Sequence, residues 1–320
     1  MSDLPARVHI HEEGPREGFQ IEPGPISTED KVRFIEALAG TGLREIECVS
    51  FVNPRRVPGQ ADAEDVARWL KRRPGVRYTC LWLNLKGLER AVASGLDLAG
   101  RLLVGASEPF TIRNAGMDLK AELGEQKRWL AKYRELGLAV EQVALFTAFG
   151  CNFAGDVTPE RVVEVTRLSL ENAAEAGFQV GKISLADTVG WATPRAVERV
   201  VGAVRQRWPD KAIALHLHDT RGVGLANAYA GLKLGVAHFD SSCGGLGGCP
   251  FAGHKGAAGN ICTEDLVFMC EEMGIDTGVD LDRLIACAQL AEKIVGHPLP
   301  GKVMRGGGLG ALRARLKAAE

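Results

Sequence analysis

The sequence lacks any long hydrophobic run, so its composition excludes a membrane-spanning helix. No stretch reaches the about 18 consecutive apolar residues that such a helix needs. The N-terminus does not begin with a basic segment followed by an apolar one, and the C-terminal LKAAE matches no targeting signal. We therefore expect a cytoplasmic protein without a membrane partner.

The sequence also has little excess charge of either sign. It contains 39 lysine and arginine residues against 40 aspartate and glutamate residues. Proteins that bind nucleic acids or membrane surfaces usually carry a marked basic excess, so we expect neither partner. A phosphate-loop motif is absent as well, so the sequence does not indicate nucleotide chemistry.

Closely spaced cysteine pairs, as found in zinc ribbons, are missing too. In a large chain without a leader, dispersed cysteines are typically reduced and buried, so we expect no disulfide framework. The eight cysteines are Cys48, Cys80, Cys151, Cys243, Cys249, Cys262, Cys270 and Cys287.

What the sequence does contain is a regular alternation of β-rich runs and helical patterns. The expected strands are Val8–Ile10, Glu45–Ser50, Val76–Leu83, Arg101–Val104, Val140–Phe146, Val180–Leu185, Ala212–His218 and His238–Ser241. The expected helices are Thr28–Ala39, Asp62–Arg72, Lys86–Ser94, Leu119–Leu136, Pro159–Ala176, Pro194–Trp208, Gly224–Leu234 and Thr263–Met273. Several helices open on a capping residue followed by proline, as at Thr158-Pro159 and Thr193-Pro194.

This alternation predicts an α/β fold. Eight strand–helix units without a break in composition favour a (β/α)8 TIM barrel, with an open doubly wound sheet as the alternative. Polar residues gather where the expected strands end, and in a barrel all of these ends converge on one mouth. We predict a barrel domain over residues 1–300 with a C-terminal helical extension that braces it, a flexible tail over residues 301–320, and a homodimer.

The clearest metal signal is the pair of histidines in His216-Leu217-His218, at the end of the seventh expected strand. Alternate residues of a strand point to the same side, so both imidazoles should face the barrel axis and can share one ion.

A glycine-rich segment follows the eighth expected strand. Within GGLGGCP, residues 244–250, four glycines surround one leucine and precede Cys249. Such a sequence gives a mobile or tightly turned loop, and mobile loops over a barrel mouth act as lids. Because a lid is a poor place to bury a thiol, Cys249 is a candidate functional residue, whereas the other cysteines are expected to be packed.

Several of these segments resemble the 3-hydroxy-3-methylglutaryl-CoA (HMG-CoA) lyase family of the DRE-TIM metallolyase superfamily. EEGPREGFQIE is similar to the family's EVGPRDGLQNE, and GLGGCP is close to a family signature. IECVSFVNP and ISLADTVGWATP are similar to IEVTSFVSP and ISLGDTIGVGTP. The resemblance runs from about Val8 to the helical extension, which is nearly the whole chain.

The resemblance implies a divalent-metal-dependent lyase. Such an enzyme would cleave HMG-CoA, or a close relative, to acetyl-CoA and a 3-oxo acid such as acetoacetate. The implied metal ligands are Glu17, His216, His218 and Asn260. Two nitrogens combined with oxygen ligands and water favour Mg²⁺ or Mn²⁺ over a closed tetrahedral zinc site.

The resemblance also implies roles in catalysis and in binding the acyl-CoA substrate. Arg16 is expected to stabilise the enolate that forms on cleavage, and Cys249 to transfer a proton to it. The candidate bases are His216 and Asp187. The residues expected to contact the substrate are Arg16, Glu47, Ser50 and Ser184.

The chain departs from the family pattern at three places. Glu17 stands where the family has an aspartate, and its longer side chain raises the possibility of a wider mouth and a bulkier substrate. His11 and Glu13 occupy positions that are apolar in the family, and the SVAGLGGCPYA of the family lid is SCGGLGGCPFA here.

Two other functions remain open. The first is a Claisen-type condensing enzyme, such as the isopropylmalate and homocitrate synthases, which share the metal-binding histidine pair and the arginine of the first loop. The second is an inactive barrel that binds acyl-CoA as a scaffold. The cysteine of the expected lid and the lack of a C-terminal regulatory domain disfavour the first, and the presence of both Arg16 and Cys249 disfavours the second.

Overall fold

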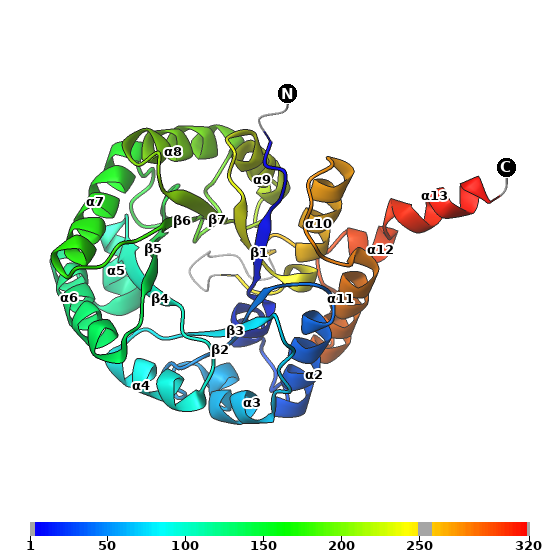
Figure 1. Cartoon of the computed structure of the whole chain (residues 1–320), viewed down its shortest axis with the longest axis horizontal. Coiled ribbons are helices and arrows are strands. Elements are labelled where there is room, and N and C mark those ends of the chain that lie inside the picture. Colours follow the sequence, from blue (N-terminus) through cyan, green and yellow to red (C-terminus); the bar gives the residue numbers. More distant parts are fainter. Residues whose placement is uncertain (1–3, 249–257, 319–320) are drawn as a thin grey trace.

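The structure, a computed structural model, describes residues 4–248 and 258–318. Parallel strands curl into a ring at its centre, and helices surround the ring (Figure 1). The strands are β1 (His9–Glu12), β2 (Glu45–Ser50), β3 (Arg77–Leu81), β4 (Gly100–Gly105), β5 (Val140–Phe146), β6 (Lys182–Ala186), β7 (Ala212–His216) and β8 (His238–Ser241).

The order of the strands distinguishes a barrel from an open sheet. The order is β3-β2-β1-β8-β7-β6-β5-β4, so the first and last strands are neighbours. At the remaining gap, Thr79 of β3 forms a parallel bridge with Asp97, just before β4. The ring is therefore closed, the predicted TIM barrel is confirmed, and the doubly wound alternative is wrong.

Apart from one short helix, the barrel helices begin within one residue of where the sequence predicts. They are α2 (Thr28–Ala39), α3 (Ala63–Trp69), α4 (Leu85–Ser94), α5 (Glu108–Ala115), α6 (Leu119–Leu136), α7 (Pro159–Glu175), α8 (Pro194–Arg207), α9 (Gly224–Lys233) and α10 (Thr263–Glu272). The hydroxyl of Thr158 accepts a hydrogen bond from the backbone of Arg161, and that of Thr193 accepts one from Ala196. These bonds satisfy N–H groups that the first helical turn leaves free.

Two local expectations differ from the structure. The seventh strand ends at His216, because the backbone of His218 bridges Asn260 instead of continuing the sheet. The short helix α5 was not predicted, since its eight residues are too few to show a clear helical period.

The two faces of the strands bury different kinds of side chain. Ile46, Tyr78 and Leu102 belong to the apolar core between the sheet and the helices. Toward the barrel axis, Glu47 of β2 forms an ion pair with Arg101 of β4, which lies two strands away. Because this contact spans the intervening strand β3, it lies inside the ring, and the centre of the barrel is polar.

Beyond the barrel, helices continue along one side of the molecule. α11 (Leu281–Val295) packs against α2 and α10, so the expected bracing extension is present. The segment expected to be a flexible tail contains α12 (Val303–Gly306) and α13 (Leu309–Lys317), and Arg313 forms an ion pair with Glu272 of α10 at 2.7 Å. In Figure 1, α13 projects away from the barrel. Flexibility of this tail remains a prediction.

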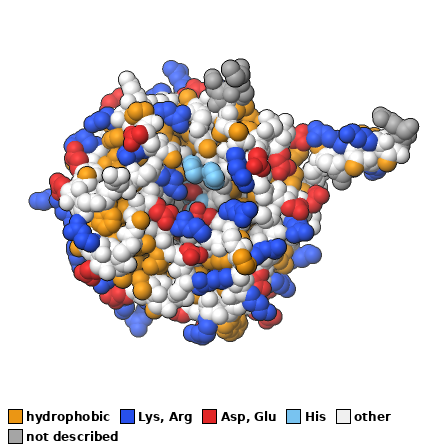
Figure 2. Space-filling view, in the orientation of Figure 1, with side chains coloured by type: hydrophobic (Ala, Val, Ile, Leu, Met, Phe, Trp, Pro, Cys, Tyr) orange, Lys and Arg blue, Asp and Glu red, His pale blue; other side chains and the backbone are white. Residues whose placement is uncertain are grey.

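The surface agrees with the balanced composition. Figure 2 shows basic and acidic side chains interspersed over the face that it presents. Within residues 4–248 and 258–318, no helix has the length and apolar character needed to cross a membrane. The cysteines in these residues are free thiols, as expected from their spacing.

A buried carboxyl connects α6 to the sheet. Glu122 of α6 accepts a hydrogen bond of 3.2 Å from the backbone N–H of Gly105, at the end of β4. Burial raises the pKa of Glu122 from 4.5 to about 7. Between these pH values the unfolded chain binds fewer protons than the folded protein, so this group makes the free energy of unfolding fall as the pH rises.

We predict that Glu122→Gln reduces this loss of stability, because glutamine keeps an oxygen acceptor for Gly105 but does not ionise. Urea unfolding of the wild type and the variant at several pH values between 4.5 and 7 measures the difference. Glu135→Gln, at an exposed position of the same helix, is the control. An identical pH dependence in Glu122→Gln and the wild type would contradict the prediction.

Candidate active site

Arg16 and Glu17 are carried into the barrel mouth by a short π-helix. This turn, η1 (Gly14–Gly18), follows β1 directly and is buried along its whole length. Single π-helical turns occur frequently at functional sites. The backbone of η1 therefore holds a guanidinium and a carboxylate inside the mouth instead of leaving them in solvent.

The four predicted metal ligands lie together, and we call Glu17, His216, His218 and Asn260 the ligand cluster. The Nε2 atoms of His216 and His218 are 3.3 Å apart. His218 Nε2 lies 3.4 Å from Glu17 Oε1, and Asn260 donates a hydrogen bond of 3.0 Å to the same oxygen. Segments more than 200 residues apart in the chain thus converge on one point.

The chemistry of the ligand cluster fits a divalent cation. Asn260 Oδ1 is buried, and no group in the described part of the chain forms a hydrogen bond with it. Its amide nitrogen donates hydrogen bonds to Glu17 and to the carbonyl oxygen of Leu246. An amide oxygen without a partner, a carboxylate and two imidazole nitrogens form a donor set that Mg²⁺ or Mn²⁺ accepts.

The neighbouring charges keep Glu17 ionised. Burial favours the neutral acid, but the charges of Arg16 and His216 outweigh burial and lower the pKa of Glu17 from 4.5 to about 2. A carboxylate that stays charged at neutral pH is a competent ligand for a cation.

Arg16 is surrounded by carboxylates. Its Nε donates to Glu47, while its two terminal nitrogens donate to Glu17 at 2.9 Å and to Glu13 at 2.7 Å. Burial alone would lower the pKa of Arg16, but these carboxylates raise it above its usual range. Arg16 is therefore a permanent, rigidly held positive charge at the mouth.

Glu47 fixes the position of Arg16 through an ion pair. It is fully buried, and its second oxygen accepts a hydrogen bond of 2.8 Å from Arg101. Both carboxylate oxygens are thus occupied by guanidinium groups, so the structure assigns Glu47 to the positioning of Arg16. Direct contact of Glu47 with substrate remains a prediction.

Two serines predicted to contact the substrate are buried close to this region. Ser50 is the last residue of β2, and its backbone N–H donates to Gln60, whose amide in turn donates to the carbonyl oxygen of Arg16. The hydroxyl of Ser50 is buried without a partner in the described residues. Ser184 lies in β6, where its backbone pairs with Ala214. Within the described residues, neither serine hydrogen-bonds to the ligand cluster.

Asp187 follows β6 and has one free oxygen. Its Oδ1 accepts hydrogen bonds from the backbone N–H groups of Trp191 and Ala192, at 2.6 Å and 2.9 Å. Its Oδ2 is buried, and nothing in the described ranges bonds to it. Burial raises the pKa of Asp187. In the described residues this carboxylate does not hydrogen-bond to His216.

His216 is instead held by two residues that the sequence analysis gave no role. Its Nδ1 lies 3.4 Å from Glu13 Oε2 and 3.4 Å from Asp240 Oδ2. Carboxylates behind a ligating imidazole fix which ring nitrogen faces the metal. The alternation of side chains along β1 could have predicted that Glu13 points toward the barrel axis. That Asp240 lies beside it follows only from the pairing of β1 with β8.

The base of the expected lid passes directly over the ligand cluster. Gly247 has a φ of +91°, and a Cβ atom there would lie 2.8 Å from Asn260 Nδ2. Only glycine suits this close approach and this backbone conformation. Cys249 itself lies outside the described residues, so its predicted role is neither supported nor contradicted by the structure.

A second feature of the same end of the barrel is a hollow of about 530 Å³. It extends from the C-terminal ends of β3, β4 and β5, marked by Leu81, Leu103 and Phe146, to Gln20 beside η1. Mostly apolar clefts of this size are typical of small-molecule sites.

Comparison with known proteins gives consistent matches over nearly the whole chain. The profile of the HMGL-like family matches residues 7–291. The hydroxymethylglutaryl-CoA lyase YngG of Bacillus subtilis is 41% identical over 298 residues, which cover 93% of this chain and 96% of that protein. The human mitochondrial hydroxymethylglutaryl-CoA lyase is 38% identical over 307 residues, covering 95% and 90%.

Solved structures agree with these matches. A crystal structure of the Bacillus subtilis HMG-CoA lyase superposes with a TM-score of 0.87 at 41% identity and covers 96% of this chain and 99% of that one. An HMG-CoA lyase from Acinetobacter baumannii, solved in complex with coenzyme A and 3-methylmalate, has a TM-score of 0.85 at 36% identity and 97% coverage of both chains.

The ligand cluster predicts how metal binding responds to substitution. His218→Ala and Asn260→Ala each remove one donor, so we expect the Kd for Mn²⁺ to rise by about 100-fold or more, the upper range for disturbed metal sites. Isothermal titration of the purified variants with Mn²⁺ measures this change. Asn227→Ala, whose buried amide donates to the carbonyl oxygen of Ala192, is the control. Wild-type affinity in His218→Ala would remove this histidine from the metal site.

Proposed function

The chain belongs to the HMGL-like family, and we propose that it is a divalent-metal-dependent lyase that cleaves HMG-CoA to acetyl-CoA and acetoacetate. The observation that carries this proposal is the ligand cluster beside Arg16. A donor set for a cation and a fixed guanidinium stand next to each other at the C-terminal mouth of a barrel. This is where enzymes of this fold place their chemistry.

We propose Mg²⁺ or Mn²⁺ as the bound ion. The carboxylate of Glu17 and the amide oxygen of Asn260 suit a hard cation, and the two imidazoles also admit Mn²⁺. A cation held there would polarise the C3 hydroxyl group of the substrate and lower its pKa.

Asp187 is the better of the two candidate bases. Both ring nitrogens of His216 are engaged, with Nε2 facing His218 and Nδ1 facing Glu13 and Asp240. Asp187 Oδ2, in contrast, is a carboxylate oxygen that no described group occupies. We therefore assign to Asp187 the removal of the C3 hydroxyl proton, as the C2–C3 bond breaks and its electron pair moves into the thioester.

Arg16 then stabilises the negative charge that develops on the thioester oxygen. Three of its five N–H groups donate to carboxylates, which leaves two for an oxygen of the substrate. Because the carboxylates fix the guanidinium before substrate arrives, little reorganisation is needed during the reaction. Cys249 supplies the proton that converts the enolate to acetyl-CoA.

We assign the pantetheine part of the acyl-CoA substrate to the hollow of about 530 Å³. Gln20, which lines this hollow, closely follows the segment that carries Arg16 and Glu17. The related Acinetobacter baumannii enzyme was solved with coenzyme A, which supports the same substrate class here. A dimeric assembly and a cytoplasmic location remain predictions.

The decisive assay measures acetyl-CoA release from HMG-CoA with and without EDTA. We expect metal-dependent release by the wild type and a fall in kcat of about 100-fold or more in Cys249→Ala, the scale of one positioned proton donor. Cys270→Ala removes a buried thiol on α10 and is the control. Full activity after exhaustive chelation, or no release with condensation of acetyl-CoA instead, would overturn the proposal in favour of another function.

Glu17 is expected to determine metal affinity. A shortened side chain loses about 1.5 Å of reach, so in Glu17→Asp the carboxylate no longer meets His218 and Asn260. We predict about tenfold weaker Mn²⁺ binding and a lower kcat/KM for HMG-CoA, the lower range for a disturbed metal site. Glu22→Asp, on the same segment but outside the cluster, is the control.

The same variants report on the width of the pocket when they are assayed with larger 3-hydroxyacyl-CoAs. If the wild type prefers HMG-CoA by about tenfold or more, a difference typical of one misfitting methylene group, the pocket is not widened. Glu17 then only replaces the aspartate of the family as a metal ligand. A preference for the larger substrates that Glu17→Asp abolishes would identify a pocket widened by this glutamate.

A further inference from the structure

A second group of metal-ligating side chains lies inside the barrel beneath the ligand cluster. We call His11, Glu13 and Asp240 the inner cluster; their ligand atoms all lie within 4.8 Å of one another. The register of β1 and β8 places His11 directly opposite Asp240. Glu13 follows two residues after His11 and therefore points the same way.

The spacing within the inner cluster is that of weak hydrogen bonds, and it also suits ligands that share one ion. His11 Nδ1 lies 3.3 Å from Glu13 Oε1 and 3.3 Å from Asp240 Oδ1. Good N–H···O bonds are about 2.7–3.2 Å long, and one N–H points at one acceptor. Ligands bound tetrahedrally at about 2.05 Å are about 3.35 Å apart. The two imidazoles of the ligand cluster show the same spacing, 3.3 Å.

The orientation of His11 supports this interpretation. Its other ring nitrogen, Nε2, lies 3.4 Å from the hydroxyl oxygen of Thr79, and the proton of that hydroxyl points to the carbonyl oxygen of Ile46. This arrangement lets the hydroxyl accept a weak hydrogen bond from His11 Nε2, which leaves Nδ1 as the ring nitrogen that faces the two carboxylates. The two carboxylates raise the pKa of His11, and a cation bound between Nδ1 and these oxygens would take the place of the Nδ1 proton.

The remaining carboxylate oxygens are used by the site above. Glu13 Oε2 accepts a hydrogen bond from Arg16, and Glu13 Oε2 and Asp240 Oδ2 flank His216 Nδ1. Each carboxylate thus offers one oxygen to the inner cluster and one to the residues of the mouth. Asp240 pairs with no lysine or arginine in the described ranges; its ionic partners there are the two imidazoles.

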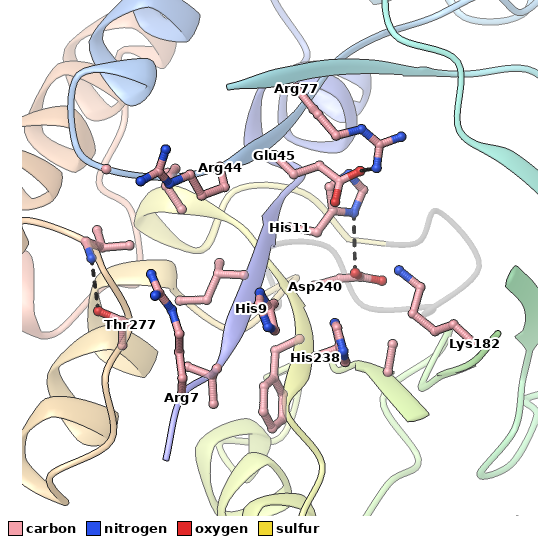
Figure 3. A pocket seen from close by; sticks show the side chains of 17 residues that line it. Arg7, His9, His11, Arg44, Glu45, Arg77, Lys182, His238, Asp240 and Thr277 are labelled. Atoms are coloured by element: carbon pink, nitrogen blue, oxygen red, sulfur yellow. Dashed lines mark hydrogen bonds and ion pairs between the residues drawn. The ribbon is translucent and has the colours of Figure 1, made fainter. Parts of the chain in front are cut away.

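The inner cluster can be reached from the opposite end of the barrel. His11 and Asp240 line a hollow of about 140 Å³ at the N-terminal ends of the strands. In Figure 3 a dashed line joins these two side chains, and His9 and His238, whose rings stack at 4.8 Å, lie close by. Figure 2 shows histidines at the centre of the same face. Water can therefore complete the coordination of an ion held there.

We propose that His11, Glu13 and Asp240 form a second metal site that binds a divalent transition-metal ion, with Zn²⁺ as its probe. One imidazole and two carboxylates, with an open fourth position, match the ligand types of open zinc sites. His216 then stands between the two sites, with Nε2 toward the ligand cluster and Nδ1 toward the carboxylates of the inner one.

The test is the metal content of the purified full-length protein. The protein is loaded with Zn²⁺, dialysed against Mg²⁺ without zinc, and analysed by inductively coupled plasma mass spectrometry. We expect the wild type to retain about one Zn²⁺ per chain, and His11→Val and Glu13→Val to retain less than about a tenth of that, as for loss of a zinc ligand. Circular dichroism checks that the variants are folded.

Three further variants make the result decisive. Thr79→Val leaves all three ligands in place and removes only the bond to His11 Nε2, so the Kd for Zn²⁺ should rise about 10- to 100-fold. His9→Val, on the same face of β1, and His218→Ala, in the ligand cluster, should keep the zinc.

Two results overturn the second site. If the wild type retains no zinc, the inner cluster is a ring of protonated imidazoles and carboxylates. If zinc is lost in His218→Ala but kept in His11→Val, it occupies the ligand cluster. Acetyl-CoA release is measured separately, so failure of this site and failure of the proposed lyase activity are distinguishable.

Discussion

The structure depends on the pairing of charges inside the barrel. Strands bury one face against the helices with apolar side chains, but their other face encloses carboxylates, guanidiniums and imidazoles. A buried charge without a partner is strongly destabilising, so these groups must be fixed relative to one another. Arg16 is the centre of this arrangement, since it joins Glu13, Glu17 and Glu47. The preorganised mouth is therefore a direct result of the requirement to compensate buried charge.

Much of the fold and part of the site could be predicted from the sequence. Alternating patterns and helix caps are local, and they located the strands and helices to within a few residues. The metal ligands were predicted from motifs. The spacing of His216 and His218 indicated this pair, and the family resemblance indicated Glu17 and Asn260. All four lie in one cluster.

What the sequence could not provide are contacts that depend on the closed ring. Arg101 supports Glu47 across an intervening strand, and Asp240 lies beside His11 and His216 because β8 is flanked by β1 and β7. Nothing local to these residues indicates such neighbours. Glu47 shows the same limit, because its two guanidinium partners, through which it positions Arg16, could not be recognised from the sequence. Its predicted contact with substrate stays a prediction.

The pairing of β1 with β8 also has a consequence for biosynthesis. His11 and Asp240 are separated by 229 positions, so a ribosome that adds roughly 5–20 residues per second needs about 10–50 s to deliver the partner of the first strand. During this time the later strands do not yet enclose the polar face of β1, and the edge of β1 that pairs with β8 has no partner. The last strand thus completes the hydrogen bonding of the first, and the cooperative folded state forms only when most of the chain has left the exit tunnel.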